Sequence, residues 1–236
     1  MAEQIYVGSE LDLFAKAVRW KSYYRSHLAR FIRGDVLEVG AGIGGTTPVL
    51  HSSAARSWVC LEPDPGLAVT LREVVQRIPV GPSPRVVVGS LTDLDATMRF
   101  DSILYIDVLE HIEHDREEIA NAAARLRPGG SLIVLSPAHQ CLYTPFDRDI
   151  GHFRRYDKRS LRNLQPKSLH EERCSYLDSA GTVLSLANRM ILRSGSPTQQ
   201  QILLWDRYVI PVSRVFDRFL GYRFGKSIFI VWRHPG

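Results

Sequence analysis

A glycine-rich segment, LEVGAGIGGTT at residues 37–47, restricts the fold of this chain more than any other stretch. An apolar run at residues 35–39 leads into the glycines, and a helical pattern begins at Thr46. Glycines at such a junction let the backbone turn tightly and let a ligand approach the main chain. The segment therefore predicts a strand, a binding loop and a helix, which together form the opening unit of a parallel α/β sheet.

The rest of the chain repeats this alternation of apolar strands and amphipathic helices. Such alternation predicts a doubly wound, mostly parallel sheet covered by helices on both faces. We expect seven strands, at residues 35–39, 57–62, 85–88, 100–106, 131–135, 174–177 and 227–232. We expect helices at residues 11–32, 46–53, 65–78, 115–126 and 160–164, with the sequence PGG at 128–130 ending the fourth.

One domain accounts for the whole length. We divide it into an N-terminal helical lid, a cofactor-binding core, a helical cap inserted before the last strand, and that strand itself, at residues 1–33, 34–180, 181–224 and 225–236.

Composition limits the functions to consider. The net charge is +5, but acids are interspersed among the basic residues, so nucleic-acid binding is not indicated. No apolar run approaches the length of a membrane span, and the N-terminus lacks a secretory pattern. Cys60, Cys141 and Cys174 are scattered and suit reduced thiols. We expect a cytoplasmic protein without an integral membrane segment; monomer and homodimer both remain open.

The glycine segment allows two ligands. Gly40, Gly42 and Gly45 have the G-x-G-x-x-G spacing of a dinucleotide site. Glu38 followed by Gly40, Gly42 and Gly44 has the E-x-G-x-G-x-G spacing of an S-adenosylmethionine site. A carboxylate at Glu38 would repel a pyrophosphate but attract an ammonium or a sulfonium, so charge favours the second ligand.

Three further segments follow in order: LEPDP at 61–65, FDSILYIDVLEHI at 100–112 and LRPGGSLIVL at 126–135. With the glycine segment, they resemble the motifs of class I S-adenosylmethionine-dependent methyltransferases. That resemblance implies methyl transfer from S-adenosylmethionine, with S-adenosylhomocysteine as product. Glu62 is placed to accept hydrogen bonds from the ribose. We expect the backbone around Leu91 to cover the adenine. Asp93 lies too far along the chain after the third strand to bond the adenine amine. The cofactor site is then predicted to consist of Glu38, Gly40, Ala41, Gly42, Glu62, Pro63, Leu91 and Asp107.

The segment after the fifth strand contains GHFRRY at residues 151–156. It resembles a methyltransferase subgroup with a G-H-x-R-R-Y signature, and the YYR at residues 23–25 and the C-terminal WDRYVIPVSRVFDRF are similar to that subgroup as well. The subgroup's acceptors are varied, so the signature does not identify the substrate. We expect acceptor contacts from Tyr23, Tyr24, His139, Tyr143, His152, Arg155 and Tyr156.

His152, Tyr24 and Asp107 are the predicted catalytic residues. An imidazole ordinarily titrates near neutral pH, so His152 could take a proton from the acceptor. The alternative is that His152 holds the lid through hydrogen bonds. For Arg154 and Arg155 we expect at least one structural bond, to Asp147 or Asp149.

The residues after the fourth and fifth strands also allow a metal site. Asp107, Glu110, His111 and His139 form a mixed nitrogen and oxygen set that is able to bind a metal. Small-RNA 2′-O-methyltransferases, which share the fold, hold a divalent ion with a similar set. The LEHI sequence is nevertheless common in metal-free relatives, where Glu110 and His111 stabilise the turn. We therefore predict no metal.

Four interpretations of the function follow. In the first, the apolar cap lines a pocket for an aromatic or indole-like natural-product intermediate. In the second, arginines among the cap's apolar residues place it on a membrane surface, where it methylates a lipid-linked or sugar acceptor. Outside this class, the dinucleotide spacing would suit an NAD-dependent oxidoreductase, and a non-catalytic relative of the fold is the remaining alternative.

Overall fold

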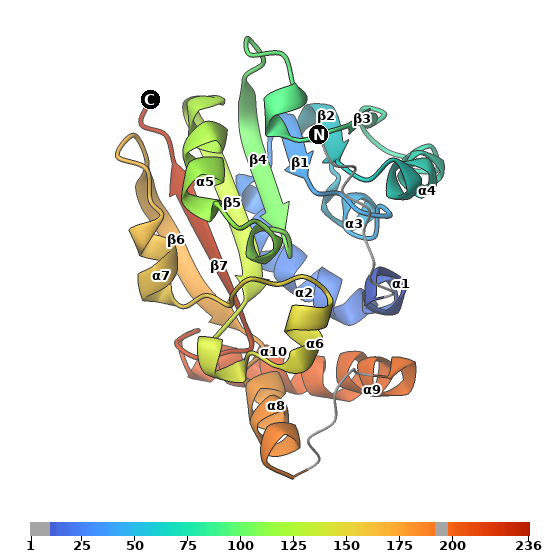
Figure 1. The fold of residues 1–236 in the computed structure, drawn as a ribbon, viewed down its shortest axis with the longest axis vertical. Helices are drawn as coiled ribbons and strands as arrows, with labels where there is room; N and C mark the ends of the chain where they lie inside the picture. Colours follow the sequence, from blue (N-terminus) through green and yellow to red (C-terminus); the bar gives the residue numbers. More distant parts are fainter. Residues whose placement is uncertain (1–9, 192–197) are drawn as a thin grey trace.

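The computed structural model describes residues 10–191 and 198–236. Their centre is a seven-stranded sheet in the order β3-β2-β1-β4-β5-β7-β6 (Figure 1). Strands β1 to β5 run parallel, and β7 runs antiparallel to both β5 and β6. The strands are β1 Gly34–Val39, β2 Ala55–Glu62, β3 Arg85–Val88, β4 Phe100–Ile106, β5 Leu126–Pro137, β6 His170–Leu177 and β7 Ser227–Arg233. The predicted fold class is confirmed.

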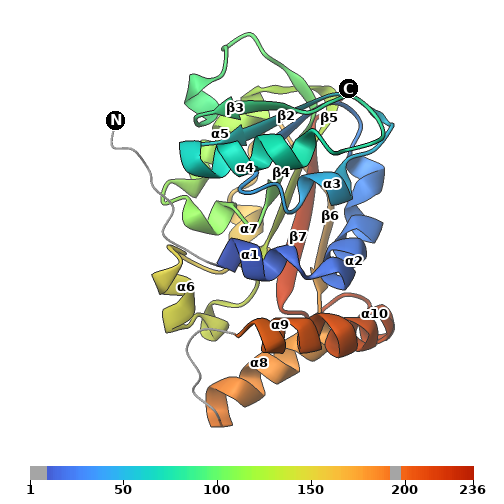
Figure 2. The ribbon, with the colours of Figure 1, turned by 90° about the vertical axis from the view of Figure 1, so that its right-hand side faces the viewer.

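The central strands are buried on both faces, because helices cover each side of the sheet (Figure 2). In β4, Ile103, Leu104 and Tyr105 are fully buried. Leu104 packs into the apolar cluster that includes Trp58, whereas Ile103 and Tyr105 pack into the cluster on the opposite face. Side chains alternate between the two clusters with the period of a strand.

Short helices connect these strands. They are α3 Thr47–Leu50, α4 Pro65–Val75, α5 Asp115–Ala124, α6 Pro145–Asp149 and α7 Lys158–Asn163. Helix α4 begins where it does because Asp64 Oδ1 accepts hydrogen bonds from the backbone N–H of Gly66 and Leu67, and Pro65 occupies the first turn.

The N-terminal helices pack against the cap at one end of the sheet. Helices α1 Glu10–Ala15 and α2 Val18–Leu28 lie between the α3–α4 layer and the cap helices in Figure 2. The cap consists of α8 Ser179–Ile191, α9 Gln199–Leu204, a π-helical turn and α10 Ile210–Phe219. The predicted lid (1–33) and cap (181–224) also include residues 1–9 and 192–197, which lie outside the described residues.

The predicted boundary between the fourth helix and the fifth strand is wrong. The PGG sequence at 128–130 does not separate a helix from a strand; α5 ends at Ala124, and β5 already begins at Leu126. The register between β4 and β5 shifts here. A Cβ on Gly130 would lie 2.9 Å from the carbonyl oxygen of Arg127 and 3.1 Å from that of Asp101, so a close backbone approach requires the glycine.

Candidate active site

The glycine loop lies at the carboxyl end of β1, beside the loop that follows β4. The strand order changes direction between β1 and β4, and ligands of open α/β sheets bind at such a point. Gly40, Gly42 and Gly44 have φ values of 65°, 55° and 80°, which L-residues rarely adopt. A Cβ on Gly40 would also lie 2.8 Å from the methyl groups of Val108. The loop conformation therefore depends on these glycines.

Glu62, at the end of β2, supports this loop. Its Oε2 accepts a hydrogen bond from the N–H of Gly42 at 2.7 Å, and its Oε1 accepts one from the N–H of Asp64 at 2.9 Å. A carboxylate has roughly four acceptor positions, so capacity remains for the two hydroxyls of a ribose. The loop and this carboxylate thus fit the polar groups of S-adenosylmethionine. Ala41 is buried beside them, and Pro63 is exposed at the rim.

The side chain of Glu38 points into the interior. Its Oε2 accepts a hydrogen bond from Trp58 Nε1 at 3.0 Å, and Cys60 Sγ lies 3.8 Å away. Burial raises the pKa of Glu38 to about 7, against which hydrogen bonds from Thr47 and Trp58 act. The charge that favoured S-adenosylmethionine in the sequence is thus only partly present at neutral pH, and the role of Glu38 toward the methyl donor stays a prediction.

The acid of the segment after β3 is used within its own turn. Asp93 Oδ2 accepts hydrogen bonds from the N–H and the hydroxyl of Ser90, at 2.7 and 2.8 Å, and so closes a capping box. Leu91 is buried within this turn, and its carbonyl oxygen accepts from Arg125.

Lys21 in α2 is a site residue that the sequence analysis missed. Its Nζ donates to the carbonyl oxygens of Gly45 at 2.6 Å and Ala15 at 3.0 Å, and so joins α1, α2 and the glycine loop. Burial lowers the pKa of Lys21 to about 8, although Asp107 and Asp206 counteract that shift. Leu11 of α1 lies 3.5 Å from the position that a Cβ on Gly42 would occupy. Helix α1 therefore rests directly on the loop, which no local motif reveals.

Asp107 follows β4 in a left-handed conformation, with φ 54°. The residue is exposed to solvent, yet protein atoms surround its carboxylate, and the resulting desolvation raises its pKa to about 6. The neighbouring basic side chains of His152, Lys21 and Lys226 oppose this rise. Asp107 is thus a solvent-exposed residue whose carboxyl group titrates near neutral pH, which is the property expected of a proton acceptor.

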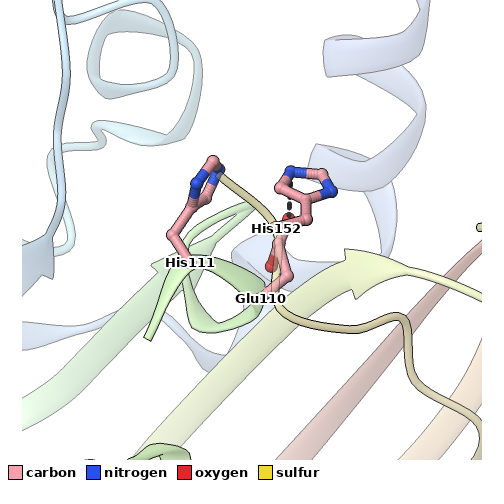
Figure 3. Close-up of side chains that lie close together, drawn as sticks. All are labelled: Glu110, His111 and His152. Atoms are coloured by element: carbon pink, nitrogen blue, oxygen red, sulfur yellow. Dashed lines mark ion pairs between the residues drawn. The ribbon is translucent and has the colours of Figure 1, made fainter. Parts of the chain in front are cut away.

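His152 lies in a cluster with Glu110 and His111, in which Glu110 is buried and both histidines are half-buried (Figure 3). His152 Nδ1 lies 3.1 Å from Asp147 Oδ1, and His152 Nε2 lies 4.0 Å from Glu110 Oε1. The rings of His111 and His152 meet edge to face, with centroids 4.4 Å apart. Burial raises the pKa of Glu110 and lowers that of His111 to about 4. The cluster thus holds a buried carboxyl group beside two imidazoles.

Asp147 fixes the segment around His152, residues 143–156, which is called the lid segment below and is distinct from the N-terminal helical lid. Its carboxylate accepts from Arg155 Nε at 2.8 Å and from the N–H and hydroxyl of Thr144. Burial alone would raise the pKa of Asp147, but the bonds from His152 and Arg155 hold it below its usual range. The expected structural bond of an arginine to Asp147 is therefore present, and Arg154 forms another, with Asp115 at 2.6 Å.

Comparison with known families identifies this arrangement. Residues 16–180, which are most of the chain, match the family model described as a methyltransferase domain. The chain belongs to this methyltransferase family. S-Adenosylmethionine is its methyl donor, and the protein is an enzyme. No curated protein matches the chain significantly.

Solved structures share the fold of this methyltransferase at low sequence identity. The N-methyltransferase NodS of Bradyrhizobium japonicum WM9, in complex with S-adenosylhomocysteine, is 15% identical with a TM-score of 0.58, over 94% of this chain and 89% of that one. An S-adenosylmethionine-dependent methyltransferase of Clostridium acetobutylicum ATCC 824 is 11% identical with a TM-score of 0.58, over 94% and 93%. The 4+2 cyclase SpnF is 14% identical with a TM-score of 0.61, over 91% and 81%. These similarities concern the fold.

The tyrosines of the methyltransferase lie in different surroundings. Tyr23 and Tyr156 are buried, and their hydroxyls donate to Asp217 Oδ2 at 2.7 Å and Asp115 Oδ2 at 2.8 Å. Tyr143 donates to the carbonyl oxygen of His152. Tyr24 reaches the glycine loop, where its hydroxyl lies 3.5 Å from Thr46 Oγ1. Of the four, Tyr24 is the one whose hydroxyl the structure brings to the loop.

His139 lies apart from the other histidines. Its ring stacks on Tyr176 at 4.9 Å and packs against Phe224, and burial lowers its pKa. Among the described residues, the side chains whose ligand atoms gather within 4.8 Å of one another are instead Glu110, His111 and His152. The possible metal-binding group named from the sequence thus contained Glu110 and His111 of this cluster. It contained His139 in place of His152.

The outward direction of the cap's apolar side chains is a correction to the pocket predicted there. Ile202, Trp205 and Ile210 are buried, but most of the large apolar side chains around them face solvent, with Tyr208 57% and Phe219 84% exposed. Within residues 198–220 the exposed set is Leu203, Leu204, Tyr208, Val212, Val215, Phe216, Phe219 and Leu220. The amphipathic pattern of the sequence gave the cap's helices correctly but not which face they bury.

Proposed function

We propose that this methyltransferase methylates a small-molecule acceptor that reaches Asp107 at the end of β4. The observation that carries the proposal is the position of Asp107, an exposed residue after β4 whose carboxyl group interacts electrostatically with Lys21, which contacts the glycine loop, and with His152. When bound, S-adenosylmethionine supplies a methyl group that is already activated by the sulfonium. The chain itself must then align the acceptor and exclude water.

Asp107 is assigned the main catalytic role. With a pKa of about 6, its carboxylate is mostly ionised at neutral pH and can accept the proton of an acceptor hydroxyl or ammonium. Tyr24 acts as a positioning donor, because burial raises its pKa and keeps the hydroxyl protonated. His152 Nε2 faces Glu110 inside the cluster, so we assign His152 to that cluster rather than to direct proton transfer.

The acceptor we propose is an aromatic or indole-like natural-product intermediate with a polar group. The outward-facing cap residues no longer support this class. Its support is Tyr143, which is half-buried in the lid, and Lys226, whose Nζ lies 5.2 Å from the centre of the Trp205 ring. Burial lowers the pKa of Lys226, and its ammonium could pair with an anionic substituent of the acceptor.

A thermal-shift experiment tests the proposed donor site directly. S-Adenosylhomocysteine should stabilise the protein, and NAD(H) should not. Labelled S-adenosylmethionine with a panel of phenols, indoles and amines should then reveal methyl transfer. Stabilisation by NAD(H) alone would overturn the proposal in favour of an oxidoreductase.

A second candidate, methylation of a lipid-linked or sugar acceptor at a membrane surface, is favoured by the outer face of α9 and α10. The exposed apolar residues recur there at three- and four-residue spacing, and the exposed charges are Arg207, Arg214, Arg218 and Arg223. The acids of residues 198–224, Asp206 and Asp217, are both buried. A basic, apolar helix face suits an anionic lipid surface. Among the described residues, no helix is long and apolar enough to cross the bilayer.

Co-sedimentation with phosphatidylserine-containing vesicles tests the second candidate. The protein should pellet with these vesicles and remain in solution with phosphatidylcholine vesicles. Equal recovery in the supernatant with both would exclude the membrane-surface function.

A further inference from the structure

The cluster of Glu110, His111 and His152 has the composition of a metal site. One ligand atom from each side chain lies within 4.8 Å of the others, and Figure 3 shows the three side chains converging between the end of β4 and the lid segment. We propose that these three residues bind a divalent transition-metal ion, preferentially zinc, beside Asp107.

The first support is an unpartnered oxygen. Glu110 is fully buried, and its Oε2 accepts a hydrogen bond from Ser136 Oγ at 2.9 Å. Its Oε1 has no hydrogen-bond partner in the part of the chain that the structure describes. A buried carboxyl oxygen without a partner costs roughly 1–3 kcal/mol, and such atoms are rare unless they have a ligand or a function. A cation at Oε1 would remove this cost.

The second support is the way in which both imidazoles are held. His152 Nδ1 is bonded to Asp147, which leaves Nε2 on the side of Glu110. His111 bonds to the backbone of Ile150, and one of its ring nitrogens belongs to the group of ligand atoms. Histidines that bind metals usually donate their other N–H to a carboxylate or a backbone carbonyl, which fixes the tautomer and the ring orientation. Both partners are present here.

Distances are compatible with closure on one ion. Zinc–nitrogen and zinc–oxygen bonds of about 2.0–2.1 Å at tetrahedral angles place two ligand atoms about 3.3 Å apart. His152 Nε2 and Glu110 Oε1 are 4.0 Å apart, so small side-chain rotations suffice. The two backbones are already joined, because the N–H of Phe153 donates to the carbonyl oxygen of Glu110 at 2.8 Å. An ion would therefore fasten the lid segment to the end of β4.

The ligand types favour zinc over magnesium or calcium. Two imidazole nitrogens and one carboxylate oxygen are a known three-ligand set for zinc, which leaves a fourth position for water or another ligand. Magnesium and calcium prefer oxygen ligands alone. The inference deepens the proposed function, since the ion would lie in the same site, but binding of the ion requires neither methyl donor nor acceptor.

Cobalt(II) titration of the chelator-treated protein tests the site, because tetrahedral cobalt absorbs in the visible. We expect one cobalt ion per chain, displaced by zinc. Glu110→Gln and His152→Gln should each weaken binding at least about 100-fold, and Ser136→Ala about 10-fold, because Ser136 only orients Glu110. His114→Gln is the matched control, since His114 is exposed and outside the cluster, and should bind like the wild type.

The outcomes separate clearly. Absence of cobalt and zinc binding by the wild-type chain at micromolar concentrations would overturn the proposal, whatever the variants do. Equal binding by wild type and a folded Glu110→Gln protein, checked by circular dichroism, would show that the metal binds elsewhere. The thermal shift with S-adenosylhomocysteine is measured on the metal-free protein, so failure of the metal site and failure of the proposed function remain distinguishable.

Discussion

The cap and the active site both bury carboxyl groups, but they supply them with very different numbers of donors. In the cap, Asp217 accepts from Tyr23 and from the N–H groups of Asp178 and Ser179. Asp178 in turn accepts from Gly181, Ser213 and Trp205. In the active site, Ser136 donates to one oxygen of Glu110, and the other, Oε1, has no hydrogen-bond partner among the described residues.

This difference distinguishes carboxyl groups with a structural role from those that can bind a ligand or a proton. A buried carboxylate with a donor for each oxygen holds segments together, as Asp217 holds α2, α8 and α10. An acid with unused acceptor capacity, such as Glu110, or one left open to solvent, such as Asp107, remains able to bind a ligand or a proton. Substitutions in the two regions should therefore change different measured quantities.

The largest effect is expected from Asp107→Asn. Loss of the proton acceptor should reduce kcat/KM by about 10²–10⁴-fold with the acceptor that screening identifies. Wild-type kcat/KM should rise with pH through about 6, as Asp107 loses its proton, and the variant should lack this rise. Asp149→Asn, at an exposed acid of the lid, is the control, and an unaltered rate for Asp107→Asn would refute the assignment.

Stability should respond most to Asp217→Ala. Removing the acceptor for Tyr23, Asp178 and Ser179 leaves three buried donors unpaired, and the free energy of unfolding should fall by about 3–5 kcal/mol. Urea denaturation measures this change. Glu110→Gln keeps the bond to Ser136 and should cost less than about 1 kcal/mol. Equal losses for the two variants would break the distinction between cap and site.

Glu38 gives a pH-dependent test at the border of the two regions. Its pKa is raised from 4.5 to about 7 in the folded protein, so its contribution to stability is fully present below pH 4.5 and is lost as the pH rises through 7. Glu38→Gln removes this loss. The wild-type free energy of unfolding should fall relative to that of the variant by up to about 3 kcal/mol between pH 4.5 and 8. Parallel pH profiles would contradict the buried position of the carboxyl group.

The smallest effect on stability is expected on the outer face of the cap. Phe219 is 84% exposed, so Phe219→Ser should change the free energy of unfolding by less than about 0.5 kcal/mol. The same variant should nevertheless reduce binding to anionic vesicles if that face contacts lipid. Ile210→Ser, at a fully buried position of the same helix, should destabilise the protein by about 2–4 kcal/mol and serves as the contrast.

The sheet and the glycine loop could be predicted from the sequence because their determinants are local. Gly40 and Gly44 are required by the backbone conformation of one loop, and short apolar runs predict the strands. The orientation of Glu38 was also within reach. It alternates with Leu37 and Val39 along β1, so it must share the face of Val36, which is buried against Trp58.

The acceptor side depends on pairs that no pattern links. Tyr23 meets Asp217, 194 residues away, and Lys21 meets the glycine loop through a backbone carbonyl that every residue possesses. His152 and Glu110 come from different segments, and the sequence offered His139 as an equally plausible neighbour. Such contacts follow from how the lid and the cap fold over the sheet, which residue spacing does not encode.

The position of α1 has a consequence for turnover. Leu11 and Ala15 of this six-residue helix lie against the glycine loop, and Lys21 ties the helix to it. Release of spent S-adenosylhomocysteine would then require this helix to lift away. The rate of product exchange, rather than methyl transfer itself, would follow the local opening of this short N-terminal helix.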